Sequence, residues 1–283
     1  MKKCFTINAL RTYDDFLGFN ELLASKDFSG IEIFYPYNVS IDQRKLYEKC
    51  LTTLTNNHPD VEVVLHLPHG GNNNLINSDY KPNKEIIKRM EEAFLFGLRY
   101  HAKKFTLHLG SAFSDLKCDR GKLINEIVKV LKDFSSEAEE NNYYIMIENM
   151  PRDNELGYSP EEILSIIEAV NNEHLKFIMD TGHAHVSSYE LSDYIDTLGE
   201  YLYHMHFSDN NGKSDEHKPI GEGTIDFVKL FTKLNEINYP ELHCLEILFN
   251  DYHDLIRYAN KIEEYNYIYQ KKDWKIAQSI VYF

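Results

Sequence analysis

Short apolar segments recur along the chain, each with the length and residue types of a β-strand. They cover residues 3–10, 30–36, 61–68, 104–110, 143–150, 175–182, 201–209 and 242–248. Several are apolar almost throughout, which is typical of a parallel sheet whose outer face is covered by helices. Successive segments begin 26 to 43 residues apart, which leaves room for a helix in each interval.

The intervals carry helical patterns. Apolar residues at helical spacing form one stripe in residues 83–101 and another in residues 120–141. Ser159 followed by Pro160 and two glutamates predicts a helix start, and residues 224–226 predict a second one. Strand and helix alternate eight times, and this pattern predicts an α/β protein of the (β/α)8 TIM-barrel type.

The length of the chain favours one barrel over two small domains. It has 283 residues, 43% of them hydrophobic, and a barrel of this kind takes roughly 250 residues. We find no linker, charge block or low-complexity tract. We therefore predict a single domain over residues 1–283, with an aromatic C-terminal extension at 264–283 that covers either the barrel or a neighbouring subunit.

The composition of the chain limits the classes of partner it is expected to bind and indicates its cellular compartment. The net charge of −15 disfavours a general nucleic-acid binder without excluding one, because bound divalent metals would make a local site less negative. The absence of a long apolar run predicts no membrane span and no signal peptide. Four scattered cysteines without a C-x-x-C pair predict reduced thiols and a cytoplasmic location.

Six of the strand segments end on side chains that bind metals. These are His66, His108, Glu148, Asp180 with His183, His206, and Glu246. One polar residue at the end of a buried strand is usually a satisfied core group, but six in register indicate a shared centre. The carboxyl ends of barrel strands meet at one mouth, where barrel enzymes keep their chemistry. The loop after the seventh strand adds Asp215 and His217.

Imidazoles and carboxylates in this mixture suit zinc, manganese, iron or cobalt, and the thiolates of a structural zinc site are missing. Four of the groups would hold one ion, and all nine could hold two or three. Glu148 and Glu246 lie three strands apart on the predicted ring. Such a pair can move a proton between neighbouring carbons of a hydroxy-ketone while the metal holds the enediolate, which is isomerase and epimerase chemistry.

Further residues near the strand ends have weaker signals. His69, Arg152 and Lys218 are the nearest candidates to contact a polar or phosphorylated substrate. His204 is expected to face outward toward a helix and to be structural. The glycines in residues 221–223 are expected to form a turn, because a lone G-x-G is a weak phosphate-binding signal.

At these residues the chain resembles the xylose-isomerase-like TIM-barrel superfamily. That superfamily includes sugar phosphate isomerases and epimerases, and the endonuclease IV group of DNA-repair enzymes. The stretches that carry the resemblance are HLPHGGNNNLIN, LHLGS, IENMP, MDTGHAH, HMHFSDNNGKSDEHKPIGEGTIDF and LEI, from residue 66 to residue 247.

The resemblance implies two metal arrangements. Glu148, Asp180, His206 and Glu246 match the four ligands of the single-metal isomerases, whose two glutamates are also the acid–base pair. Endonuclease IV holds three zinc ions, and a metal-bound hydroxide attacks a DNA phosphate beside an abasic sugar. Its nine ligands match His66, His108, Glu148, Asp180, His183, His206, Asp215, His217 and Glu246.

Departures from the nuclease pattern favour the isomerase. Residues 150–159 read MPRDNELGYS and lack the glycine- and glutamine-rich DNA-contacting stretch, and the loop at residues 67–77 is longer than in the nucleases. We expect a sugar or sugar-phosphate isomerase or epimerase that needs one to three divalent ions, zinc or manganese. The alternative is a zinc phosphodiesterase of the endonuclease IV type acting on abasic DNA. The oligomeric state stays open.

Overall fold

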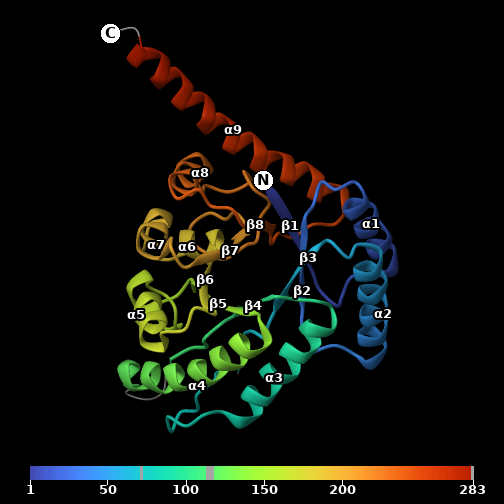
Figure 1. Ribbon diagram of the computed structural model, residues 1–283, viewed down its shortest axis with the longest axis vertical. Helices are drawn as coiled ribbons and strands as arrows, with labels where there is room; N and C mark the ends of the chain where they lie inside the picture. Colours follow the sequence, from blue (N-terminus) through green and yellow to red (C-terminus); the bar gives the residue numbers. More distant parts are fainter. Residues whose placement is uncertain (71–72, 113–117, 282–283) are drawn as a thin grey trace.

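A closed barrel of eight parallel strands forms the centre of the protein (Figure 1). The computed structural model describes residues 1–70, 73–112 and 118–281. Each strand pairs with the next along the chain, and β8 pairs with β1, so the expected (β/α)8 barrel is confirmed. The strands are β1 (Lys2–Ile7), β2 (Gly30–Phe34), β3 (Glu62–His66), β4 (Lys104–Leu107), β5 (Tyr144–Glu148), β6 (Leu175–Asp180), β7 (Leu202–Phe207) and β8 (Leu242–Leu245).

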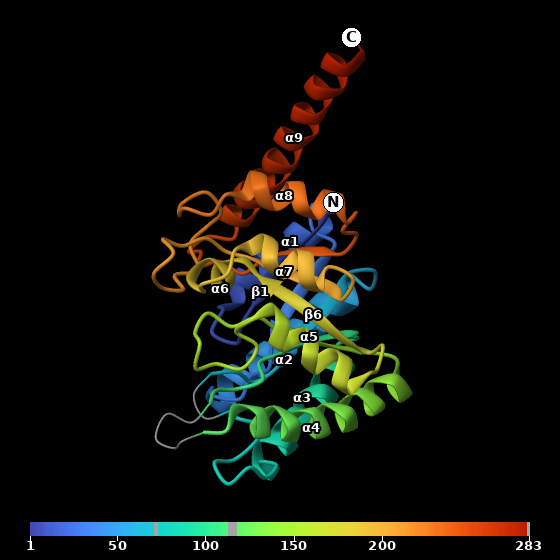
Figure 2. The same ribbon diagram turned by 90° about the vertical axis from the view of Figure 1, so that its left-hand side faces the viewer.

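Helices surround the barrel as an outer ring (Figures 1 and 2). They are α1 (Tyr13–Ala24), α2 (Ile41–Asn57), α3 (Lys84–Arg99), α4 (Arg120–Asn141), α5 (Pro160–Val170), α6 (Thr181–Val186), α7 (Leu191–Leu198), α8 (Phe227–Glu236) and α9 (His253–Val281). The predicted helices are present, and the side chains of Ser159 and Asp226 cap α5 and α8 as the sequence indicates. None of the helices in the described part of the chain has the length and apolarity needed to cross a membrane.

Two apolar layers follow from strand alternation, because successive side chains point to opposite faces. The larger layer fills the space between strands and helices and contains Phe105, Phe177 and Phe207. The smaller one lies inside the barrel and consists of Cys4, Val64, Met146, Ile178, Leu242 and Cys244. The barrel is therefore filled by side chains between its two ends.

All eight strands end two or three residues before their predicted ends, and for β6 the reason is a helix cap. The strand predicted over 175–182 ends at Asp180, because its carboxylate caps α6 by accepting a 2.6 Å hydrogen bond from the backbone N–H of His183. α9 begins at His253 and runs to Val281, so it continues into the segment 264–283 that we predicted as a C-terminal extension. Both views show α9 continuing beyond the ring of other helices (Figures 1 and 2).

Candidate metal centre

Four buried side chains converge at the carboxyl end of the barrel. Glu148, Asp180, His206 and Glu246 each offer one nitrogen or oxygen, and these atoms lie within 4.8 Å of one another. The Nδ1 atom of His206 is 2.9 Å from an oxygen of Glu246 and 3.3 Å from one of Glu148. It is 3.8 Å from Oδ2 of Asp180. The strand ends therefore place four donors around one point.

Two further groups of predicted ligands flank these four. On one side, Nε2 of His108 and Nε2 of His66 lie 2.8 and 3.5 Å from Oε2 of Glu148. On the other side, Nε2 of His217 and Nε2 of His183 lie 3.0 and 3.3 Å from Oδ2 of Asp215. All nine residues singled out from the sequence thus lie in one connected cluster.

Backbone carbonyls orient three of the histidines. The Nδ1 atoms of His66, His183 and His217 lie 2.9, 2.9 and 3.1 Å from the carbonyl oxygens of residues 67, 149 and 246. A ring nitrogen that donates to a carbonyl leaves the opposite nitrogen available to a metal when the ring is neutral. In each of the three rings that opposite nitrogen, Nε2, faces a carboxylate.

The carboxylates of the cluster differ in how well neighbouring charges compensate them. Burial, together with nearby Glu246, Asp215 and Glu148, raises the pKa of Asp180 from 3.8 to about 7, although His183 opposes the shift. Burial would also raise the pKa of Glu246, but His206 and His217 outweigh it and hold that pKa at about 2. Among the described residues, Oδ2 of Asp180 is a buried oxygen without a hydrogen-bond partner.

These features fit a divalent cation. A buried carboxylate oxygen without a donor is costly, and a cation between the four groups would give it a partner. Imidazole nitrogens and carboxylate oxygens are the donors that zinc and manganese accept. The residues that could hold such an ion are Glu148, Asp180, His206 and Glu246, with the two flanking groups able to hold others.

A cavity of about 240 Å³ opens onto the cluster. Glu148 and Glu246 both line it, and so do two of the predicted substrate contacts, His69 and Arg152. Burial and the neighbouring rings of His66 and His108 lower the pKa of His69 to about 2, so its imidazole is neutral. Lys218 is not among the described residues that line this cavity, and its ammonium lies 2.9 Å from Glu216.

The expectation that His204 faces outward toward a helix is wrong. Its ring is fully buried inside the barrel, and its Nε2 lies 2.9 Å from Oε2 of Glu32. Residues two positions apart on a strand face the same side, so His204 points inward with His206. Glu32 itself was missed, because it stands in the middle of a strand. An acid inside the apolar run GIEIF was the available signal, since such a group needs a buried partner.

Two further residues outside the prediction shape the site. The side chain of Asn149 pairs with the backbone of Asp180, accepting from its N–H at 2.7 Å and donating to its carbonyl at 3.0 Å. The carboxylate of Asp209 accepts the backbone N–H groups of Gly221 and Gly223 at 3.0 and 2.9 Å. The G-x-G segment is thus a turn folded around Asp209.

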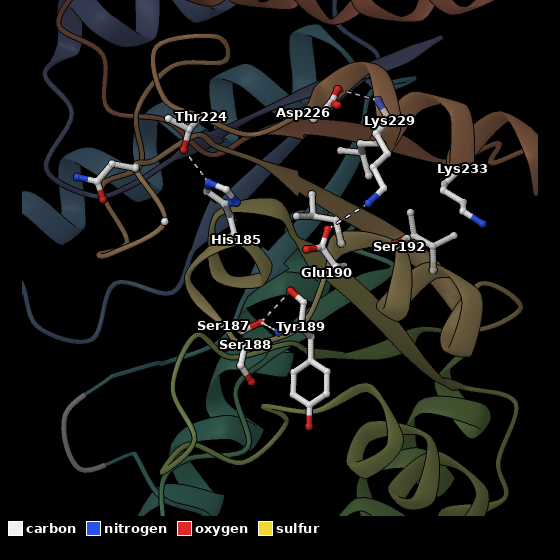
Figure 3. Close-up of a pocket in the computed structure, with 15 residues that line it drawn as sticks. His185, Ser187, Ser188, Tyr189, Glu190, Ser192, Thr224, Asp226, Lys229 and Lys233 are labelled. Atoms are coloured by element: carbon white, nitrogen blue, oxygen red, sulfur yellow. Dashed lines mark hydrogen bonds and ion pairs between the residues drawn. The ribbon is translucent and has the colours of Figure 1, made fainter.

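A second cavity, of about 420 Å³, lies between α7 and α8 (Figure 3). None of the nine predicted ligands is among the described residues that line it. Figure 3 shows two pairs among its polar groups: Nε2 of His185 lies 2.8 Å from Oγ1 of Thr224, and the ammonium of Lys229 lies 3.1 Å from Glu190. The chemistry of the cluster therefore belongs to the smaller cavity at the mouth.

The fold and the cluster together define a class: (β/α)8 barrels with a metal-competent site at the carboxyl ends of the strands. A family model described as xylose isomerase-like TIM barrel matches residues 21–262, and the chain belongs to this family. The family comprises sugar epimerases and isomerases as well as endonuclease IV-like enzymes.

Three proteins that are similar to this chain illustrate the range of the family. An uncharacterized protein of Methanocaldococcus jannaschii is 26% identical over 75% of this chain and 73% of its own length. A probable endonuclease 4 of Malacoplasma penetrans is 31% identical over 62% of each chain. The solved structure of a D-tagatose 3-epimerase-like protein superposes with a TM-score of 0.79 at 24% identity, covering 96% of this chain and 99% of that one. At that identity the likeness bears on the fold alone.

Proposed function

We propose that this protein is a divalent-metal-dependent sugar or sugar-phosphate epimerase or isomerase. The observation that carries the proposal is the pairing of Glu148 and Glu246, which contact the same nitrogen of His206 and line the same small cavity. A divalent ion held by these residues with Asp180 would polarise the oxygens of a bound hydroxy-ketone.

The two glutamates have the properties of a proton-exchanging pair. Burial alone would raise the pKa of Glu148, but His108 and His206 outweigh it and hold the pKa well below its ordinary range. Glu148 and Glu246 are therefore both carboxylates at neutral pH. One removes a proton from a carbon beside the carbonyl and becomes protonated. The same glutamate then returns a proton to the substrate, or the second delivers one taken from solvent while the first releases its own to solvent.

The cavity favours a small polar substrate. The neutral ring of His69 can donate or accept one hydrogen bond to a hydroxyl group. Arg152 brings the positive charge that a phosphate group or an oxygen-rich ketose would meet. These two residues are our candidates for substrate binding, and Lys218 is the weaker one because its charge is paired with Glu216.

Glu246→Gln tests the exchange directly. We expect the variant to lose proton exchange at least 100-fold while its metal affinity is only weakened, because the amide cannot act as a base. The measurement is solvent deuterium entering a panel of ketoses, followed by NMR, with metal content determined on the same samples. Glu168→Gln is the matched control, since Glu168 is exposed on α5 and is not among the described residues that line the cavity. Full exchange in Glu246→Gln would exclude the two-glutamate mechanism.

The second candidate is a zinc phosphodiesterase of the endonuclease IV type. One observation favours it. His66 and His108 lie close to Glu148, and His183 and His217 lie close to Asp215. A single-metal epimerase does not need these two additional groups of ligands. Against it stands the net charge of −15, because DNA binding depends on a basic surface that neutralises phosphates.

Metal content separates the two candidates. For the epimerase we expect one exchangeable ion per chain, manganese or zinc, and turnover of a ketose. About three zinc ions per chain, together with cleavage of an oligonucleotide that contains an abasic site, would establish the phosphodiesterase instead. The analysis requires protein purified without chelator. The variant His183→Ala is analysed alongside the unmodified chain, and it should bind fewer ions only if the group around Asp215 holds a metal.

A further inference from the structure

A buried acid lies directly beneath the candidate metal centre. Glu32 stands in the middle of β2 and is fully buried. Its Oε1 accepts a hydrogen bond from the hydroxyl of Thr106 at 2.8 Å. Its Oε2 lies 2.9 Å from Nε2 of His204 and 2.6 Å from Nε2 of His206. A buried carboxylate persists only with such partners, and here both oxygens have them.

The contact with His206 has a consequence for the ring. His206 has two nitrogens: Nε2 faces Glu32, and Nδ1 faces Glu148 and Glu246 at 3.3 and 2.9 Å. In His66, His183 and His217, Nδ1 contacts a backbone carbonyl and Nε2 is left for a metal. His206 is reversed, because a side-chain carboxylate holds its Nε2.

We propose that Glu32 is a positioning residue that keeps the Nε2 of His206 protonated and its Nδ1 directed at Glu148, Asp180 and Glu246. This inference rests on the proposed metal function and extends it to a strand, β2, that contributes no ligand. A carboxylate that accepts from the far nitrogen of a metal-binding imidazole fixes the ring and increases its basicity. Thr106 and His204 anchor the carboxylate in turn, so it cannot rotate away.

Glu32, His204 and His206 could also be viewed as metal ligands, since their donor atoms lie within 4.8 Å of one another. The distances favour hydrogen bonds, because both nitrogens approach the same oxygen at 2.6 and 2.9 Å, the range of charge-assisted N–H···O contacts. A ligand role for Glu32 makes a different prediction: its removal would eliminate one whole ion from the loaded protein.

Metal affinity is the first readout. We compare the full chain with Glu32→Gln and Glu32→Ala by titrating Zn²⁺ and Mn²⁺ against a chelating indicator. We expect Glu32→Ala to bind the first ion about 10- to 100-fold more weakly, and Glu32→Gln to lose less, because its amide oxygen still accepts from His206. Unchanged affinity in both variants, or the loss of one ion with the remaining affinity unchanged, would overturn the proposal.

Lys104→Met is the matched control. Lys104 is buried at the opposite end of the barrel, where its ammonium lies 2.6 Å from Glu62 and 2.8 Å from Glu241. This variant also removes an interior charge, but it leaves His206 untouched. We expect its metal affinity to stay within threefold of the unmodified chain. An equal loss in Lys104→Met and Glu32→Ala would mean that any damage to the barrel interior weakens the site.

The second readout does not depend on metal. In protein labelled with ¹⁵N-histidine, the N–H that His206 donates to Glu32 should give a downfield, slowly exchanging proton signal in both metal-free and zinc-loaded samples. The signal should persist in Glu32→Gln at a changed shift, and its absence from the unmodified chain would refute the proposal. If the unmodified chain binds no metal but shows this signal, the metal function fails while the contact between Glu32 and His206 stands. If Glu32→Ala does not fold, Glu32→Gln supplies both readouts.

Discussion

At the scale of single residues, the site consists of buried charged side chains. Each would destabilise the fold alone, and its neighbours compensate its charge. Asp180 shows this most clearly. Its Oδ1 caps α6, while Oδ2 is buried without a hydrogen bond among the described residues. Glu148 and Glu246 add negative charge nearby, and the imidazoles of His183 and His206 offset part of it. Without a cation, this carboxylate destabilises the folded state once it ionises.

Asp180→Asn should therefore stabilise the metal-free protein at alkaline pH. The folded pKa of Asp180 is raised from 3.8 to about 7, so its stability contribution is complete below pH 4 and lost as the pH rises through about 7. We expect the variant to gain about 2–4 kcal/mol over the unmodified chain at pH 8, and less at pH 5, while losing metal binding. Urea unfolding with chelator present measures both values.

The exposed residue Asp60 provides the control for this experiment. Asp60→Asn should change the free energy of unfolding by less than about 0.5 kcal/mol at either pH. A metal-free Asp180→Asn protein that is less stable than the unmodified chain at pH 8 would show that the buried carboxylate is satisfied without a cation.

At the scale of elements, the site depends on the junction between β5 and α6. Asn149 follows β5 and is fully buried, and its side chain makes two hydrogen bonds to the backbone of Asp180. The carbonyl of Asn149 also meets Nδ1 of His183, on the first turn of α6. One residue thus connects two strand ends and one helix, and it sets the positions of two predicted ligands.

Asn149→Ala should loosen this junction. Two buried backbone groups of Asp180 would lose their partners, which costs roughly 2–4 kcal/mol of folding stability. We also expect weaker metal binding, because Asp180 and His183 would no longer share a fixed frame. Thermal melting and a metal titration on the same samples measure the two effects.

Asn141→Ala is the control for that change. Asn141 is exposed, and its amide donates to the carbonyl of Glu137 within α4. The same substitution there should cost less than about 0.5 kcal/mol, because water replaces the lost hydrogen bond. Similar losses at both positions would contradict the special role of the junction.

At the scale of the whole molecule, the C-terminal helix α9 packs against the barrel with its first turns. The early part of α9 contributes Leu255, Tyr258, Ala259 and Ile262 to the core. The ammonium of Lys3 on β1 lies 2.6 Å from a carboxylate oxygen of Glu263. Figure 2 shows the later part of α9 extending away from the other helices. The first part of α9 therefore belongs to the barrel.

A chain that ends at residue 267 tests this division. It keeps the core contacts of α9, so we expect a melting temperature within about 3 °C of the full chain and unchanged metal binding. A chain that ends at residue 254 removes the four core residues and should not fold. Light scattering on both full and shortened chains shows whether residues 268–283 hold copies of the chain together. Unfolding of the 1–267 chain would instead make this segment part of the barrel.

The sequence by itself determined the barrel and the composition of its mouth. Strand and helix periodicity are local patterns, and parallel strands that close a ring must bring their carboxyl ends together. The nine metal-competent residues could therefore be identified from their positions, and the structure brings them together. Glu246 and His183 needed no contact information, since each comes directly at or after a strand end.

Only the tertiary structure decided which way each ring faces and what lies beneath it. Glu32 binds His206 across 174 residues of chain, and no local pattern connects a mid-strand acid to a distant histidine. The same holds for Asn149 with Asp180, whose side-chain and backbone groups meet across 31 residues of chain. These contacts depend on the stagger of the closed barrel and on competition for buried hydrogen bonds, which the order of residues along the chain does not specify.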